Sequence, residues 1–203
     1  MSSANCTIVG RRTSSGSYEL NSTSYVGDGS STQFYPYWLK FTTPAFSGAS
    51  QSVLFTLSLM QGYRNGTKSP KVNLRWALCA SDANYAKYNT SADVSDSNQI
   101  VKGTVSYEEL QSSTYSNRAL NVVVTGLKPN TDYYLVLWGN NSGGYSGDTA
   151  TMNAASKHSA VLEYSSGVVR IGDLTSVAYM DTGSGWTALI TNKADGTQWE
   201  VCV

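Results

Sequence analysis

Apolar and polar residues alternate along much of this chain with the two-residue period of a β-strand that buries one face. The clearest stretch is 120–138, LNVVVTGLKPNTDYYLVLW, in which two alternating runs flank a turn that contains Gly126 and Pro129. Proline has no backbone N–H to donate to a sheet, so its presence predicts a corner between two strands. The positions predicted to face inward are Leu120, Val122, Val124, Tyr133, Leu135 and Leu137.

Three upstream stretches repeat this alternation, at 35–42, 52–60 and 72–79, and a shorter strand is predicted at 100–105. Their predicted inward positions are Tyr35, Tyr37, Leu39, Phe41, Val53, Phe55, Leu57, Leu59, Val72, Leu74, Trp76 and Leu78. No stretch keeps a helical period, although one brief helical turn fits within 83–88. The pattern therefore predicts an all-β protein with about seven to nine short strands in an antiparallel β-sandwich.

The corner between the last two runs has a spaced pattern of residues, Leu127, Pro129, Thr131 and Tyr133. A buried tyrosine at the start of the second strand can bond its hydroxyl to the backbone of the turn, forming a tyrosine corner. These residues resemble the corner between strands E and F of fibronectin type III and related sandwich domains. The resemblance implies a fibronectin III-like or jelly-roll sandwich, and it implies no chemistry, because such folds carry many functions.

Changes in composition divide the chain into four parts. Residues 1–34 are polar and glycine-punctuated, which predicts an N-terminal arm with weak strands, and 35–140 form the sandwich. Residues 141–159 are rich in Gly, Ser and Asn, which is typical of a loop or linker. The remaining part, 160–203, is predicted to form a small C-terminal β-hairpin unit. Because so few strands cannot bury themselves, this unit must pack on the sandwich, on itself or on another copy.

The C-terminal part contains two similar units, each with a strand, a turn that holds Asp or Asn with Gly, and a second strand led by Trp186 or Trp199. These units, together with WLKFTTPAFSG at 38–48, resemble minor structural and tail-associated proteins of phages and prophages of Gram-positive bacteria. The second turn, 192–196, is longer than the compact Asn-Gly turn of that pattern. The resemblance implies a virion component, made in the host cytoplasm, whose partners are other virion proteins and further copies of itself.

Charge is scarce and balanced, since 14 Lys and Arg against 14 Asp and Glu make up 14% of the chain, compared with about 25% in ordinary domains. Without a basic excess, no nucleic-acid partner is expected. No apolar run is long enough to insert into a membrane, and the N-terminal residues lack the apolar core of a signal peptide. A surface of Ser, Thr, Asn, Gly and Tyr is typical of β proteins that contact proteins or sugars, and its low charge favours self-association.

No catalytic residue and no cofactor is predicted. The one histidine, His158, falls in the predicted linker, where a solvated loop residue is expected instead of a fixed catalytic group. No G-x-S-x-G nucleophile elbow is present. Glu108 and Glu109 are adjacent acids, but neighbours on a strand point to opposite faces and cannot form the carboxylate pair of a glycosidase.

No metal site is predicted either. Three cysteines are too few and too scattered for a zinc site or a disulfide framework, and two of them read as small buried apolar residues, Cys79 and Cys202. The polar loop at 80–99 has an oxygen-rich cluster that could hold calcium, Asp93, Ser95, Asp96 and Asn98. This cluster lacks the spacing and distal Glu of an EF-hand, so a solvated loop is the preferred interpretation.

Aromatic residues in predicted loops are the candidate ligand-binding residues. Sugar recognition uses aromatic faces for stacking and planar polar groups for hydroxyls, and the candidates here are Tyr63, Arg64, Tyr85 and Tyr88. The competing interpretation places these aromatics in the core or in a subunit interface.

The sequence supports two main functional hypotheses. The first is a non-enzymatic virion structural protein of a phage tail, baseplate, fibre or capsid surface, which assembles as a homo-oligomer and contacts a host-surface glycan. The alternative is a carbohydrate-binding β-sandwich module. A hydrolase is a third hypothesis, which no motif in the sequence favours.

Overall fold

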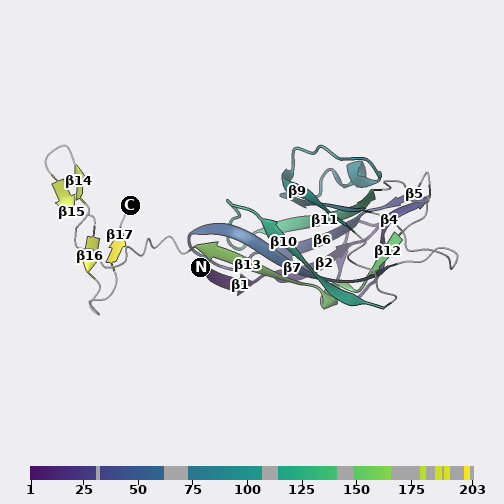
Figure 1. The fold of residues 1–203 in the computed structure, drawn as a ribbon, viewed down its shortest axis with the longest axis horizontal. Coiled ribbons are helices and arrows are strands. Elements are labelled where there is room, and N and C mark those ends of the chain that lie inside the picture. Colours follow the sequence, from purple (N-terminus) through teal and green to yellow (C-terminus); the bar gives the residue numbers. More distant parts are fainter. Residues whose placement is uncertain are drawn as a thin grey trace.

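Two antiparallel sheets lie face to face and enclose the main core, which confirms the predicted all-β sandwich (Figure 1). The parts of the chain that this computed structural model describes are residues 1–30, 33–61, 73–106, 114–140 and 149–165, and four short strands between 179 and 201. In these parts, helical structure is limited to two 3-10 turns, η1 (Tyr85–Tyr88) and η3 (Ala155–Lys157). Neither has the length and apolar character needed to cross a membrane.

Each sheet combines strands that are far apart in the sequence. The first sheet runs in the order β1 (Ser2–Asn5), β13 (Ser159–Ser165), β7 (Ala49–Gln61), β12 (Thr149–Met152), β4 (Ser24–Ser30) and β5 (Gln33–Tyr35), and β7 also pairs with β10 (Ser116–Val123). The second sheet runs in the order β3 (Tyr18–Glu19), β2 (Thr7–Arg12), β6 (Tyr37–Thr42), β11 (Asp132–Asn140), β8 (Asn73–Cys79) and β9 (Gln99–Ser106).

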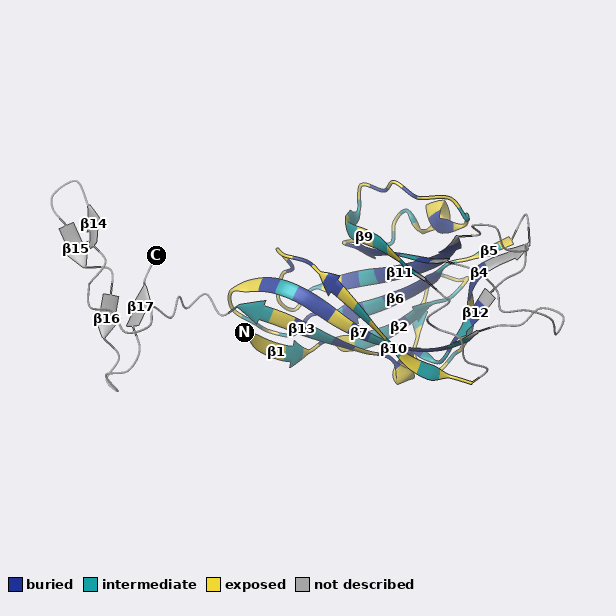
Figure 2. Ribbon diagram, viewed as in Figure 1, coloured by how far each residue is buried: buried dark blue, intermediate teal, exposed yellow. Residues whose placement is uncertain are grey.

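The main core forms from the inward positions that the alternation predicts. Leu39, Phe41, Val53, Phe55 and Leu135 are all fully buried between the sheets, while the outward positions of β10 remain exposed (Figure 2). Phe41 on β6 packs edge-on against Phe55 on β7, with 5.2 Å between the ring centroids. Among the described residues, one predicted inward residue is wrong: Tyr35 is 37% exposed, because Pro36 separates the end of β5 from the start of β6. Val72 lies outside the described residues.

A second core lies on the outer face of the second sheet, beneath the loop at 80–98. Tyr88 is completely buried there between Trp38 and Trp138, with 5.0 Å from its ring centroid to each of theirs. The loop is fastened by its backbone, since the indole N–H of Trp138 donates to the carbonyl of Ala92 at 3.0 Å. Both faces of β11 are therefore buried, which explains why its outward positions, Val136 included, are also apolar.

The predicted corner forms between β10 and β11. The backbone N–H of Lys128 donates to the hydroxyl of Tyr133 at 2.9 Å, and Tyr133 is 6% exposed. Thr131 donates its hydroxyl to the carbonyl of Pro129 at 2.8 Å, and Leu127 is buried beneath the turn. These bonds fix the direction in which the chain enters β11, the central strand of its sheet.

The predicted part boundaries differ from the strand pairing of the described residues. Within the predicted arm, β2 pairs with β6 and β4 pairs with β12, so this segment belongs to both sheets. The predicted linker contributes β12 and η3, and β13 from the predicted C-terminal unit pairs with β7. Short strands rich in Ser, Gly and Thr carry little local signal, and long-range pairing decides their structure.

The two C-terminal hairpins pair as the repeated units predict. The first joins β14 (Tyr179–Asp181) to β15 (Trp186–Ala188), and the second joins β16 (Ile190–Asn192) to β17 (Trp199–Val201). In register, Asp181 stands opposite Trp186 and Asn192 stands opposite Trp199.

Candidate functional site

An open groove of about 610 Å³ lies where the β2–β3 hairpin meets β4, β5 and η1. Figure 1 shows β4 and β5 at the end of the sandwich far from the N-terminus. The groove wall combines aromatic and proline side chains with polar ones: Tyr25, Phe34, Tyr35, Pro36, Trp38 and Tyr85, with Arg11, Arg12, Thr13, Ser14, Glu19, Ser24 and Asn89. Its size falls within the range of small-molecule sites, about 300 to 1,000 Å³.

The β2–β3 hairpin depends on two glycines. Gly10 has a φ of 151° at a bulge in β2, and a Cβ atom there would lie 2.7 Å from the backbone nitrogen of Glu19. Gly16 has a φ of 87° in the turn, where the N–H of Thr13 donates to the carbonyl of Ser17 at 2.8 Å. Glycine tolerates these φ values without strain. Next to Gly10, where β2 and β3 approach closely, Arg11 stands directly opposite Glu19 in register, at the groove wall.

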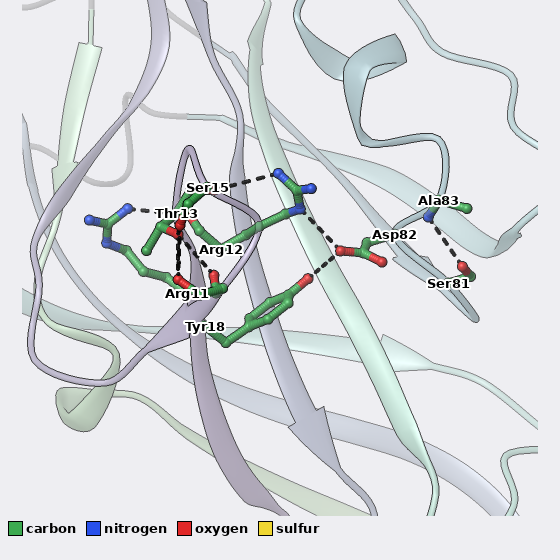
Figure 3. Close-up of polar contacts among 9 residues, drawn as sticks. Arg11, Arg12, Thr13, Ser15, Tyr18, Ser81, Asp82 and Ala83 are labelled. Carbon is green, nitrogen blue, oxygen red and sulfur yellow. Dashed lines mark hydrogen bonds and ion pairs between the residues drawn. The ribbon is translucent and has the colours of Figure 1, made fainter.

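Asp82, from the loop at 80–98, ties this hairpin to the loop that carries Tyr85. Its Oδ2 accepts hydrogen bonds from the Nε of Arg12 at 3.1 Å and from the hydroxyl of Tyr18 at 2.8 Å (Figure 3). Burial and the neighbouring Asp82 carboxylate raise the pKa of Tyr18, so its hydroxyl stays protonated as the donor. The guanidinium carbon of Arg12 lies 3.6 Å from the ring centroid of Tyr85, a cation–π contact.

Three tyrosines of the groove wall keep a large exposed surface. Tyr25 is 57% exposed, Tyr35 37% and Tyr85 40%. Tyr25 and Tyr35 come from neighbouring strands, and their ring centroids lie 6.1 Å apart. Large exposed aromatic rings that gather around a concave surface are typical of binding sites, because burying them against a ligand is favourable.

The predicted ligand-binding residues have different outcomes. Tyr85 lies in the groove wall, as a surface ligand residue should. Tyr88 was predicted to be a surface residue and this is wrong, because η1 turns it into the second core, where Gln99 donates to its hydroxyl at 2.9 Å. Tyr63 and Arg64 lie outside the described residues.

Sequence reasoning missed the other groove residues. Tyr25 lies in a stretch predicted to be an irregular arm, and Tyr35 was assigned to the core. Arg12 carries no local signal at all, because its role depends on Asp82, 70 residues away in the sequence. The Pro36 that follows Tyr35 was a usable signal, since a proline between two strands interrupts the alternation.

The candidate calcium loop satisfies its carboxylates with protein donors. Asp93 accepts from the Nζ of Lys102 at 2.7 Å, which lowers the pKa of Asp93. Asp96 is buried, which by itself would raise its pKa, but bonds from the backbone N–H of Asn98 and the side chain of Asn84 lower it overall. Across the described residues, His, Cys, Asp and Glu side chains form no group of three that could hold a metal ion.

His158 was predicted to be a solvated loop residue, and this is wrong. It is 6% exposed between the sheets, where its Nδ1 accepts the backbone N–H of Ser58 at 2.9 Å. Its ring lies edge-on to Tyr37, with 5.9 Å between the ring centroids. Burial lowers the pKa of His158 to about 4, so the imidazole is neutral at pH 7. The residue fell in a polar stretch of sequence, which hid its inward position next to η3.

Burial lowers the pKa of His158 but raises the pKa of the cysteine thiols of the sandwich. Cys6 and Cys79 are buried, which raises the pKa of each to about 11 and keeps both thiols protonated. Cys79 therefore acts as a small core residue, as predicted, and Cys202 lies outside the described residues.

Comparisons with known proteins give only distant structural similarity. No protein-family model matches the sequence, and no curated protein matches it. The C-terminal CBM6 of LamC, a marine laminarinase from Zobellia galactanivorans, is 11% identical with a TM-score of 0.34, over 80% of this chain and 92% of that chain. TmCBM61, solved in complex with β-1,4-galactotriose, is 10% identical with a TM-score of 0.29, over 70% and 69%.

A hydrolase of the CocE/NonD family, SACOL2612 from Staphylococcus aureus, is 10% identical with a TM-score of 0.33 and covers 77% of this chain and 36% of its own. At these scores, the similarities carry no argument about what this chain binds. The groove itself is therefore the basis for proposing a function.

Proposed function

We propose that this protein binds carbohydrate without turning it over, and that the groove between the β2–β3 hairpin, β5 and η1 is its binding site. The observation that carries the proposal is the set of three exposed tyrosines around one concave surface, Tyr25, Tyr35 and Tyr85. A sugar ring has an apolar face of C–H groups that packs on such rings, and its hydroxyls need hydrogen-bond partners at the rim.

The groove supplies those partners in a fixed arrangement. The guanidinium of Arg12 is held in place on two sides. Its Nε lies 3.1 Å from Oδ2 of Asp82, and its central carbon lies 3.6 Å from the ring centroid of Tyr85. Glu19 and Asn89 add acceptors and donors at the same wall. Because the Arg12 guanidinium is positioned before a ligand arrives, binding does not have to pay the entropy of ordering it.

A glycan array followed by calorimetric titration tests the proposal. We expect Tyr25→Ala and Tyr85→Ala each to weaken binding of the best array ligand by about twofold to tenfold, since an aromatic stacking contact contributes about 0.5 to 1.5 kcal/mol. The matched control is Tyr115→Ala, because Tyr115 is also 37% exposed but lies outside the groove wall. Equal affinity of all three variants and the wild type would show that the groove is not the binding site.

The C-terminal hairpins favour a second candidate function, assembly as a phage virion component. The observation is that both units pair as two-stranded hairpins whose second strand starts at a Trp, which fits the strand, turn and Trp-led strand on which the resemblance to tail-associated proteins rests. Isolated two-stranded hairpins are only marginally stable, so they gain from packing on other copies. Light scattering after size-exclusion chromatography tests this role: a concentration-dependent oligomer that a chain ending at residue 165 does not form supports it, and a strict monomer opposes it.

A further inference from the structure

We propose that Asp82 determines the charge class of the ligand, by cancelling the charge of Arg12 so that the groove selects uncharged sugars over acidic ones. This inference rests on the proposed carbohydrate-binding function. Asp82 does not line the groove and is a positioning residue, which acts through Arg12 and not by touching the ligand.

Positive and negative charges at or next to the groove wall are equal in number, with Arg11 and Arg12 against Glu19 and Asp82. The Nε of Arg12 is ion-paired with Asp82 at 3.1 Å, and the two side chains are 15% and 26% exposed, so solvent reaches the pair only in part. Arg11 stands directly opposite Glu19 on the neighbouring antiparallel strand, and in the described part of the chain no ion pair joins their side chains. The Nε of Arg11 is also committed to the hydroxyl of Ser22 at 2.7 Å.

Lys40, a cation that lies near Tyr18, is also paired with a carboxylate. Lys40 lies with its Nζ 5.6 Å from the ring centroid of Tyr18, and it pairs with Asp132 at 2.8 Å. The hydrogen bond from Lys40 and the bond from Thr42 lower the pKa of Asp132, which keeps this carboxylate ionised. The formal charges of these six groups therefore sum to zero, which leaves no net positive charge to attract the carboxylate of an acidic sugar.

The geometry also limits what Arg12 can offer a ligand. Its Nε donates to Asp82 and one face of its guanidinium lies against Tyr85, so the part left for a ligand is the other face and the edge of the guanidinium. That edge can donate hydrogen bonds to hydroxyl oxygens. With the positive charge already cancelled by Asp82, a carboxylate gains little more from this edge than a hydroxyl does.

The experiment uses the full chain and an array that holds neutral hexose oligosaccharides beside chains containing uronate or sialate, at 20 and 500 mM NaCl. For the wild type, we expect the strongest signals from neutral chains, with less than about a twofold change between the two salt concentrations, because screening acts on net charge. For Asp82→Asn, we expect binding of acidic chains at 20 mM NaCl to rise by about twofold to fivefold and to return to the wild-type level at 500 mM.

Tyr18→Phe is the matched control, because it removes the other hydrogen bond to Asp82 at 2.8 Å and leaves every charge in place. It is expected to leave the ratio of acidic to neutral binding unchanged. If the wild type prefers acidic chains in a salt-dependent way, the inference is overturned while the proposed function stands. This measurement uses the wild type alone, so it does not depend on any variant folding. A folded Asp82→Asn protein with the wild-type ratio would also overturn it. If no glycan binds at all, the proposed function fails and this inference fails with it.

Discussion

Acidification should destabilise this protein between pH 7 and pH 5 because of one buried side chain. Burial lowers the pKa of His158 from its ordinary 6.5 to about 4 in the folded state. Between these values the unfolded chain takes up a proton that the folded protein does not, so stability is lost as the pH falls from about 6.5 to about 4. The difference corresponds to about 3 kcal/mol in full, of which about 2 kcal/mol is lost between pH 7 and pH 5.

Urea unfolding at pH 7, 6 and 5, followed by tryptophan fluorescence, measures this loss. The comparison variant is His158→Asn, whose amide oxygen can accept the N–H of Ser58 as Nδ1 does and which does not ionise in this range. We expect the variant to be less stable at pH 7, since it lacks the packed ring, but to lose much less stability on going to pH 5. Other titrating groups are common to both proteins and cancel in the comparison. The same pH dependence in both proteins would refute the assignment of the effect to His158.

Two further predictions concern packing and the corner, and thermal or urea unfolding measures both. Gly103→Ala should destabilise the sandwich by about 1 to 3 kcal/mol, because the added Cβ would lie 2.5 Å from the indole ring of buried Trp76; a neutral effect would show that β9 can move away. Tyr133→Phe should cost about 1 kcal/mol, because it removes the acceptor of the Lys128 N–H, and a stability equal to the wild type would show that water replaces the hydroxyl.

The central strands could be predicted from the sequence because their signal is local. In β6, β7 and β11 the side chains alternate between the main core and the opposite face, so the period of two in the sequence identifies the strands, although the opposite face of β11 is also buried. The corner at Tyr133 was equally local, since its tyrosine and the N–H that it accepts are only five residues apart.

The groove could not be predicted, because none of its decisive contacts is local. Arg12 meets Asp82 across 70 residues, and Tyr85 gains its role from lying over Arg12. Tyr85 and Tyr88 look alike in the sequence, and only the packing of the loop on Trp38 separates an exposed ring from a buried one. Two strands of the N-terminal segment, β1 and β4, are likewise defined by partners from the second half of the chain.

The most direct test of the account is to map the bound ligand on the protein by nuclear magnetic resonance. Backbone amide shifts would be followed while the strongest array glycan is added to the ¹⁵N-labelled full chain. We expect the largest shifts on the groove segments at 11–14, 24–25, 34–35 and 85–89. Saturable binding with its largest shifts elsewhere on the sandwich, or no shifts with any glycan, would contradict it.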